Sequence, residues 1–160
     1  MGAVYFYHLT RSALDQALSM LLDRALGAGW RVAVRGQAAA RLDWLDQRLW
    51  LGPEEGFLPH GLAGGPQDAS QPVLLTTGAL PDGCACLMAV DGAEVTAAEV
   101  AETERCCILF DGNDPAAVAR ARQQWKMLTG AGLAALYWSE ESGRWQKKAE
   151  SAGAGRQTAS

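Results

Sequence analysis

Two cations and an aromatic residue stand close together in a segment whose periodicity predicts a helix. Arg122 and Lys126 are four residues apart and therefore share one helical face, with Trp125 at the edge of that face. Cations beside an aromatic side chain suit a peptide that carries carboxylates and a bulky apolar end. The competing interpretation is that Trp125 is half-buried packing and that both cations are simply solvated.

The four cysteines fall in two tight pairs, Cys84 with Cys86 and Cys106 with Cys107. Neither pair has the two-residue spacer of zinc knuckles or of thioredoxin-type redox motifs. We therefore expect buried free thiols and no metal site.

His60, Asp43 and Asp46 are residue types that acid–base and metal sites use. The two aspartates, however, lie on a predicted helix face that also carries Arg41 and Arg48, which is typical of a solvated charged face. The sequence contains no serine elbow and no HExxH motif. It therefore offers no catalytic residue and no cofactor site that can be named, so an enzyme is unsupported by these residues but is not excluded.

Two segments could be mistaken for nucleotide-binding loops. The turn after the first predicted strand reads His8-Leu9-Thr10-Arg11 and lacks the glycine that lets a backbone approach a pyrophosphate. The glycine-rich run from Gly61 to Pro66 is not followed by the Lys-Ser/Thr pair of a phosphate-binding loop. A small-molecule or nucleotide-binding α/β enzyme of unknown substrate stays open as the alternative function, and it predicts that a ligand raises the melting temperature.

Strands and helices alternate along the predicted structure. Helices are expected after a Ser12 cap, over Gln37–Trp50, over Thr96–Thr103, and from the Asp114-Pro115 cap to about Thr129. The first strand, helix and strand form a unit whose two strands should be parallel. This alternation predicts an α/β fold of three layers, with a mostly parallel sheet and helices on both faces. Short apolar runs predict the strands Ala3–Tyr7, Trp30–Val34, Pro72–Thr77, Cys84–Val90, Cys106–Phe110 and a last strand Leu133–Ser139, with a Pro81-Asp82-Gly83 turn between the third and fourth.

Length and charge limit the remaining possibilities. A chain of 160 residues that is 49% hydrophobic fits one domain, which we place at residues 1–148, followed by a disordered tail at 149–160. The formal charge of -4 argues against direct nucleic-acid binding. Because no long apolar run and no signal peptide occur, we expect a cytoplasmic protein without a membrane partner. Residues 51–72 lack periodicity and predict a long loop.

Several motifs together resemble one family, the chi subunit of bacterial DNA polymerase III. The most specific is the combination of Leu42-Asp43 and Leu49-Trp50 with the Phe57-Leu58-Pro59-His60 segment that follows. Further matches are Val4-Tyr5-Phe6-Tyr7, Gly29-Trp30-Arg31-Val32, Pro72-Val73-Leu74-Leu75, Phe110-Asp111, Arg120, Arg122 to Lys126, and Ala131-Gly132.

The resemblance implies a fold similar to nucleotide-binding domains that holds no nucleotide site. It also implies a non-catalytic adaptor in the clamp-loader complex, with two partners. One is the psi subunit, and the other is the acidic C-terminal tail of single-stranded DNA-binding protein, called the SSB tail below.

By motif position, the resemblance assigns two groups of residues. Trp50, Arg122, Trp125 and Lys126 would form the SSB-tail site, with the cations pairing with acidic groups and the tryptophans shaping an apolar pocket. Phe57, Leu58 and Pro59 would face psi. The family has a basic residue where Val118 stands and usually tyrosine where Trp125 stands, and the loss of that cation should weaken attraction to an acidic tail.

Overall fold

The computed structural model describes residues 2–11, 13–50, 61–62, 72–78, 80, 83–140 and 145–151. The helices are α1 (Leu14–Gly27), α2 (Ala39–Trp50), α3 (Ala97–Glu102) and α4 (Pro115–Gly130). The strands are β1 (Ala3–Leu9), β2 (Val32–Arg35), β3 (Gly61–Leu62), β4 (Val73–Thr76), β5 (Cys86–Ala89), β6 (Arg105–Asp111), β7 (Ala134–Ser139) and β8 (Gln146–Ser151).

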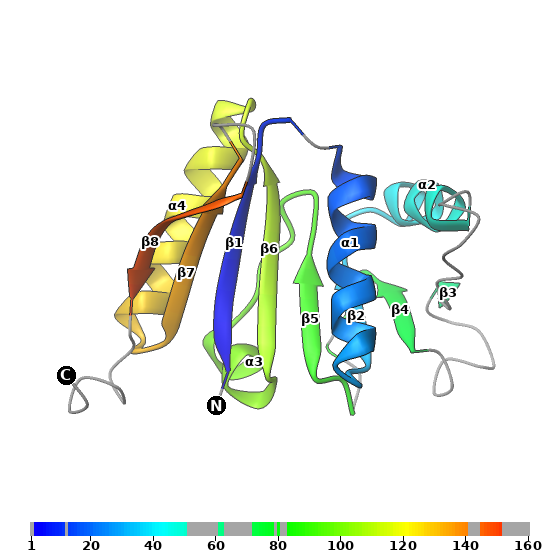
Figure 1. The fold of residues 1–160 in the computed structure, drawn as a ribbon, viewed down its shortest axis with the longest axis horizontal. Coiled ribbons are helices and arrows are strands. Elements are labelled where there is room, and N and C mark those ends of the chain that lie inside the picture. The colour runs from blue at the N-terminus through cyan, green and yellow to red at the C-terminus, as the bar shows by residue number, and fades with distance from the viewer. Residues whose placement is uncertain are drawn as a thin grey trace.

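The strands in the described part of the chain form one eight-stranded sheet in the order β3-β4-β2-β5-β6-β1-β7-β8. Every neighbouring pair is parallel except β7 with β8, which is antiparallel (Figure 1). The predicted parallel relation of β1 and β2 is confirmed, although β5 and β6 lie between them. The Pro81-Asp82-Gly83 turn was predicted between β4 and β5. These two strands are not neighbours in the sheet, because β2 lies between them.

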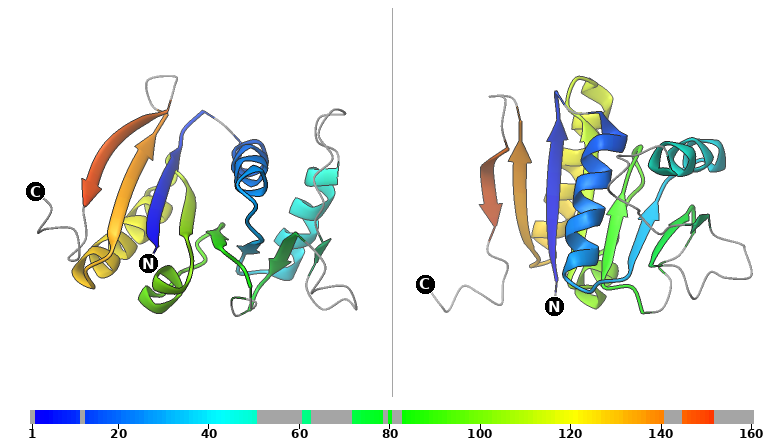
Figure 2. Two further views of the ribbon diagram at one scale, coloured as in Figure 1. Left: turned by 60° about the horizontal axis from the view of Figure 1, so that its bottom comes forward. Right: turned by 45° about the vertical axis from the view of Figure 1, so that its right-hand side comes forward.

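Helices cover both faces of the sheet, so the predicted three-layer α/β fold is confirmed. Side chains of α1 and α2 share one hydrophobic core, and those of α3 and α4 share the other. The two views of Figure 2 show α1 and α4 on opposite sides of the strands. Residues of β2 alternate between the layers, with Val32 and Val34 in the first core and Ala33 in the second. Each fully buried aliphatic side chain of such a strand contributes roughly 1.5–3 kcal/mol to folding.

Local backbone chemistry sets the helix ends. The N-cap of α1 is Ala13 and not the predicted Ser12, which lies outside the described residues. The helix ends where Gly29 adopts a φ of 82° and the amide of Trp30 donates back to the carbonyl of Ala25, a left-handed stop that favours glycine. α3 begins at Thr96, which forms a reciprocal capping box with Glu99.

The C-terminal part of the sheet differs from the prediction. β7 was expected to be the last strand, but β8 follows it and forms the edge of the sheet. β8 runs to Ser151 and so includes residues that we assigned to the tail, while residues 152–160 lie outside the described part. The two-residue strand β3 lies within the segment that was predicted to be a loop. Within the described part of the chain, no helix has the length and apolarity needed to cross a membrane.

Candidate protein-binding surface on α4

The start and end of α4 follow directly from its sequence. Asp114 accepts a hydrogen bond from the amide of Ala116 at 3.0 Å, and Pro115 occupies the first turn, where it costs no hydrogen bond. At the other end Gly132 has a φ of 87°, and the amide of Leu133 donates to the carbonyl of Leu128. The helix therefore has a fixed register, and the face that each side chain occupies is fixed with it.

The core side of α4 consists of Ala117, Ala121, Gln124 and Leu128. Gln124 lies three residues after Ala121 and four before Leu128, so its spacing fits the same helical stripe as the apolar residues. Gln124 is only 8% exposed, and its Oε1 accepts a hydrogen bond from the amide of Val95 at 3.1 Å. A buried amide side chain that ties a helix to a neighbouring loop is a positioning element, because an unpaired backbone donor would be costly.

Trp125 lies on the flank of α4 that faces β1 and β7. Its ring packs edge-on against Phe6, with centroids 5.4 Å apart, and against Tyr137 at 6.1 Å. The side chain is half-buried at the margin of the second core. Such aromatic pairs contribute about 0.5–1.5 kcal/mol beyond the burial of their area. Trp125 therefore has a packing role, and only part of its surface is accessible to a partner.

Arg122 and Lys126 extend from the exposed side of α4 next to Trp125. Neither forms an ion pair with any residue that the structure describes. Arg120 is also exposed, but at about 100° per residue it lies roughly 160° from Arg122, on the opposite flank of the helix. The predicted pairing of Arg122 and Lys126 on one face is thus present, and their charges are available in this structure.

The structure separates Trp50 from the other three predicted tail-site residues. Trp50 ends α2, which contributes to the first core and contacts β3 and β4, whereas α4 lies on the other face against β6 and β7. Figure 1 shows the two helices at opposite ends of the sheet. The backbone positions of Trp50 and of the other three residues thus lie in helices on opposite faces of the sheet, and their assignment to one site stays a prediction.

The other predicted residues fall into two groups. Phe57, Leu58, Pro59 and His60 lie outside the described residues. Asp43 is exposed and accepts a hydrogen bond from Gln47, so its surroundings are those of a solvated helix face. No group of three or more potential metal ligands occurs among the residues that the structure describes.

The cysteines are buried free thiols, as predicted. Burial raises the pKa of Cys106 to about 12. A hydrogen bond with Cys86, and burial after it, raise the pKa of Cys107 well above its ordinary value. Thiols with such raised pKa values are protonated near neutral pH and poorly nucleophilic, so Cys106 and Cys107 act as small core side chains.

A carboxylate that the sequence analysis did not single out holds the turn after β1. Glu140 is 5% exposed, and its Oε2 accepts hydrogen bonds from the amides of Thr10 and Arg11, both at 3.1 Å. Because its partners are about 130 residues away in the chain, no local sequence signal could have revealed this contact.

Comparison with known proteins agrees with the resemblance seen in the sequence. The family model of the DNA polymerase III chi subunit, HolC, matches residues 1–135. This range includes α1 to α4 and ends within β7, so β8 lies beyond it. A search of curated proteins finds no match. Chi is a non-catalytic accessory subunit of the polymerase. Because the family model covers most of the chain, the chain belongs to the DNA polymerase III chi subunit family.

Proposed function

We propose that this chi subunit is a cytoplasmic adaptor that links the clamp loader, through psi, to the SSB tail. The exposed side of α4 binds the SSB tail in this proposal, and residues 57–59 contact psi. The adaptor carries out no reaction itself. Its role is to hold the replicase close to the protein that coats single-stranded DNA.

The observation that supports the SSB-tail site best is the pair of exposed cations on α4. Arg122 and Lys126 lie side by side, and neither has an ion-pair partner among the described residues. An acidic peptide therefore need not compete with an internal carboxylate for either cation. Arg122 can hold a carboxylate with two parallel hydrogen bonds, whereas Lys126 acts as a point charge.

The flank of α4 beside these cations can receive an apolar group. Val118 and Trp125 are both half-buried, and both pack against the second core. Their exposed parts form an apolar margin next to Arg122. A peptide with carboxylates followed by a bulky apolar residue matches this order of charged and apolar surface.

The two partners have separate surfaces in this proposal. α4 lies toward the β8 edge of the sheet. The segment proposed to face psi follows Trp50 of α2 and precedes Gly61 of β3, and both of these elements lie toward the opposite edge. An adaptor with binding surfaces at opposite edges can engage both partners at once.

A fluorescence-anisotropy titration tests the SSB-tail site. A labelled C-terminal peptide of the host's SSB is titrated with wild type, with Arg122→Ala, and with the matched control Arg120→Ala. We expect Arg122→Ala to weaken binding about tenfold, because one charge-assisted contact is worth roughly 1.4 kcal/mol. The control, which removes the same charge from the opposite flank, should change the affinity far less. Equal losses in both variants would contradict the proposed location.

The psi surface has its own test. Phe57→Ala should reduce co-purification with the host's psi subunit while leaving the affinity for the SSB peptide unchanged. Removal of a buried aromatic anchor from an interface typically costs more than 2 kcal/mol. Unchanged capture of psi by Phe57→Ala would refute this part of the proposal.

A further inference from the structure

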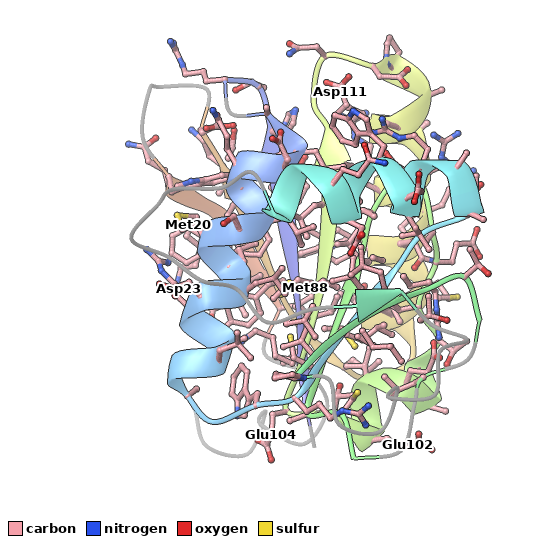
Figure 3. The ribbon with its side chains drawn as sticks, turned by 90° about the vertical axis from the view of Figure 1, so that its right-hand side faces the viewer. Met20, Asp23, Met88, Glu102, Glu104 and Asp111 are labelled. Atoms are coloured by element: carbon pink, nitrogen blue, oxygen red, sulfur yellow. The ribbon has the colours of Figure 1, made fainter. Side chains whose placement is uncertain are left out.

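A cavity of about 600 Å³ lies at the carboxyl ends of the parallel strands. Its lining includes Leu9 of β1, Phe110 and Asp111 of β6, and the Asp91–Gly92 turn that follows β5. Figure 3 shows Asp111 at this end of the sheet and Glu104 at the other. The volume falls within the range of about 300–1,000 Å³ that small-molecule sites occupy.

The topology places this cavity where the chain changes direction. The connection after β1 passes through α1 on one face of the sheet, whereas the connection after β6, the neighbour of β1, passes through α4 on the other face. Diverging connections leave a crevice between two adjacent parallel strands. In open α/β sheets, ligands bind in this crevice.

The charges around the cavity disfavour a phosphate. The turn after β1, where dinucleotide-binding folds hold a pyrophosphate, is occupied by the chain's own Glu140 carboxylate, which accepts from the amides of Thr10 and Arg11. Arg41 is already paired with Asp91, at 3.1 Å. The charged residues of the lining are Arg41 and Arg120 against Asp91, Glu94, Asp111 and Asp114.

Unused hydrogen-bond donors face the same cavity. Gln124 lines it and is 8% exposed. Its Oε1 is held by the amide of Val95, which fixes the orientation of the group, and its Nε2 donates to no residue that the structure describes. A ligand with a carbonyl or ring-nitrogen acceptor can accept a hydrogen bond from this Nε2.

A second set of donors lies over the Asp91–Gly92 turn. Gln37 donates to the carbonyl of Gly92 at 2.6 Å, and a Cβ at Gly92 would lie 3.1 Å from Nε of Arg120. Arg120 has no ion-pair partner in the described part of the chain. Its guanidinium, together with Gln37, can therefore bind hydroxyl or carbonyl oxygens at the rim.

The wall that α4 contributes is small and apolar. Ala117 and Ala121 face the cavity with no more than a methyl group each, and Leu9 and Phe110 lie on the strand side. A flat ring system fits between such surfaces without displacing a large side chain.

We propose that this cavity binds a nucleoside without phosphates. The flat base lies against Ala117 and Ala121, a base carbonyl or ring nitrogen accepts from Gln124, and the sugar hydroxyls contact Arg120 and the acidic rim. The ligand is uncharged, because phosphate would meet the surplus of carboxylates. This inference does not depend on the SSB-tail proposal, since the cavity lies on the other flank of α4.

Calorimetric titration and saturation-transfer NMR test the proposal with adenosine, guanosine, cytidine, thymidine and their 5′-monophosphates. We expect at least one nucleoside to bind wild type and its monophosphate to bind about tenfold more weakly. Ala117→Leu, which fills the cavity, should abolish binding. Ala119→Leu, on the exposed side of α4, should leave it unchanged. Arg120→Ala should weaken nucleoside binding and, because Arg120 is an exposed residue, offers a second variant if Ala117→Leu does not fold.

Three results would overturn the proposal. The first is that none of the four nucleosides binds at millimolar concentration. The second is that binding persists in both Ala117→Leu and Arg120→Ala. The third is that a monophosphate binds more tightly than its nucleoside, which would assign the cavity to anionic ligands.

Discussion

The arginine at the end of β2 is paired and mostly buried, whereas the two cations on one face of α4 are exposed. Arg35 donates to Glu99 at 2.8 Å, to the carbonyl of Glu94 at 2.9 Å and to the carbonyl of Gly78 at 3.0 Å, and its side chain is only 12% exposed. Arg122 and Lys126 are exposed and lack ion-pair partners among the described residues. The same kind of charge thus stabilises the fold in one region and stays available to a partner in the other. The two regions should respond differently to substitution.

Arg35→Met should have the largest effect on stability. It leaves the mostly buried Glu99 carboxylate and two carbonyls without their donor, and breaking a buried pair in this way costs about 3 kcal/mol. Urea denaturation followed by circular dichroism measures the loss. Affinity for the SSB peptide should not change below the unfolding transition. A stability loss no larger than that of an exposed pair would remove the contrast between the two regions.

Trp125→Ala should cost about 2 kcal/mol, less than the loss of a fully buried aromatic because the ring is half-buried. Its contacts with Phe6 and Tyr137 disappear. Trp125→Phe keeps an aromatic ring on the same flank and should recover most of the stability. If Trp125→Ala unfolds at the same urea concentration as wild type, the side chain serves only the binding surface, and the packing role described above is wrong.

Helix α4 also shows what the sequence could and could not predict. The cap at Asp114 and the i, i+4 spacing of Arg122 and Lys126 are local features, so the register and exposed face of α4 were predictable. The angular position of Trp125 left two roles open, and only its contacts with β1 and β7 identify packing.

Long-range features were not predictable. β1 has β6 and β7 as neighbours, an arrangement that no local pattern encodes, and the separation of Trp50 from α4 follows from it. The contacts of Glu140 with Thr10 and Arg11 and the pairing of Arg35 with Glu99 likewise depend on strand order. β8 is exposed and polar along nearly its whole length, so it lacks the apolar alternation that identifies a strand.

The paired region should also respond to acid. Hydrogen bonding to Arg35 lowers the pKa of Glu99 below its ordinary value of 4.5. A carboxyl with a lowered folded-state pKa contributes stability that is fully present above the ordinary value and is lost as the pH falls through the folded-state pKa. Wild type should therefore lose stability below about pH 4.5, and Glu99→Gln should show a smaller loss over the same interval. Parallel pH profiles for the two proteins would contradict this linkage.

Arg41→Ala should have the smallest effect. Its pair with Asp91 is more exposed, with side-chain exposures of 45% and 25%, and such pairs contribute at most about 0.5 kcal/mol. The same urea titration measures this difference, with Arg35→Met as the comparison. A loss as large as that of Arg35→Met would mean that exposure does not distinguish the two pairs.

The most direct test of the adaptor account is a double-mutant cycle between Lys126 and the acidic residues of the SSB peptide. Anisotropy gives the affinities of wild type and Lys126→Glu for the native peptide and for peptides in which one acidic residue at a time is replaced by lysine. The account predicts that Lys126→Glu weakens the native peptide about tenfold, more at low salt than at high salt, and that one lysine-substituted peptide recovers affinity for the variant. Equal affinities of wild type and Lys126→Glu for every peptide would contradict the claim that α4 binds the SSB tail.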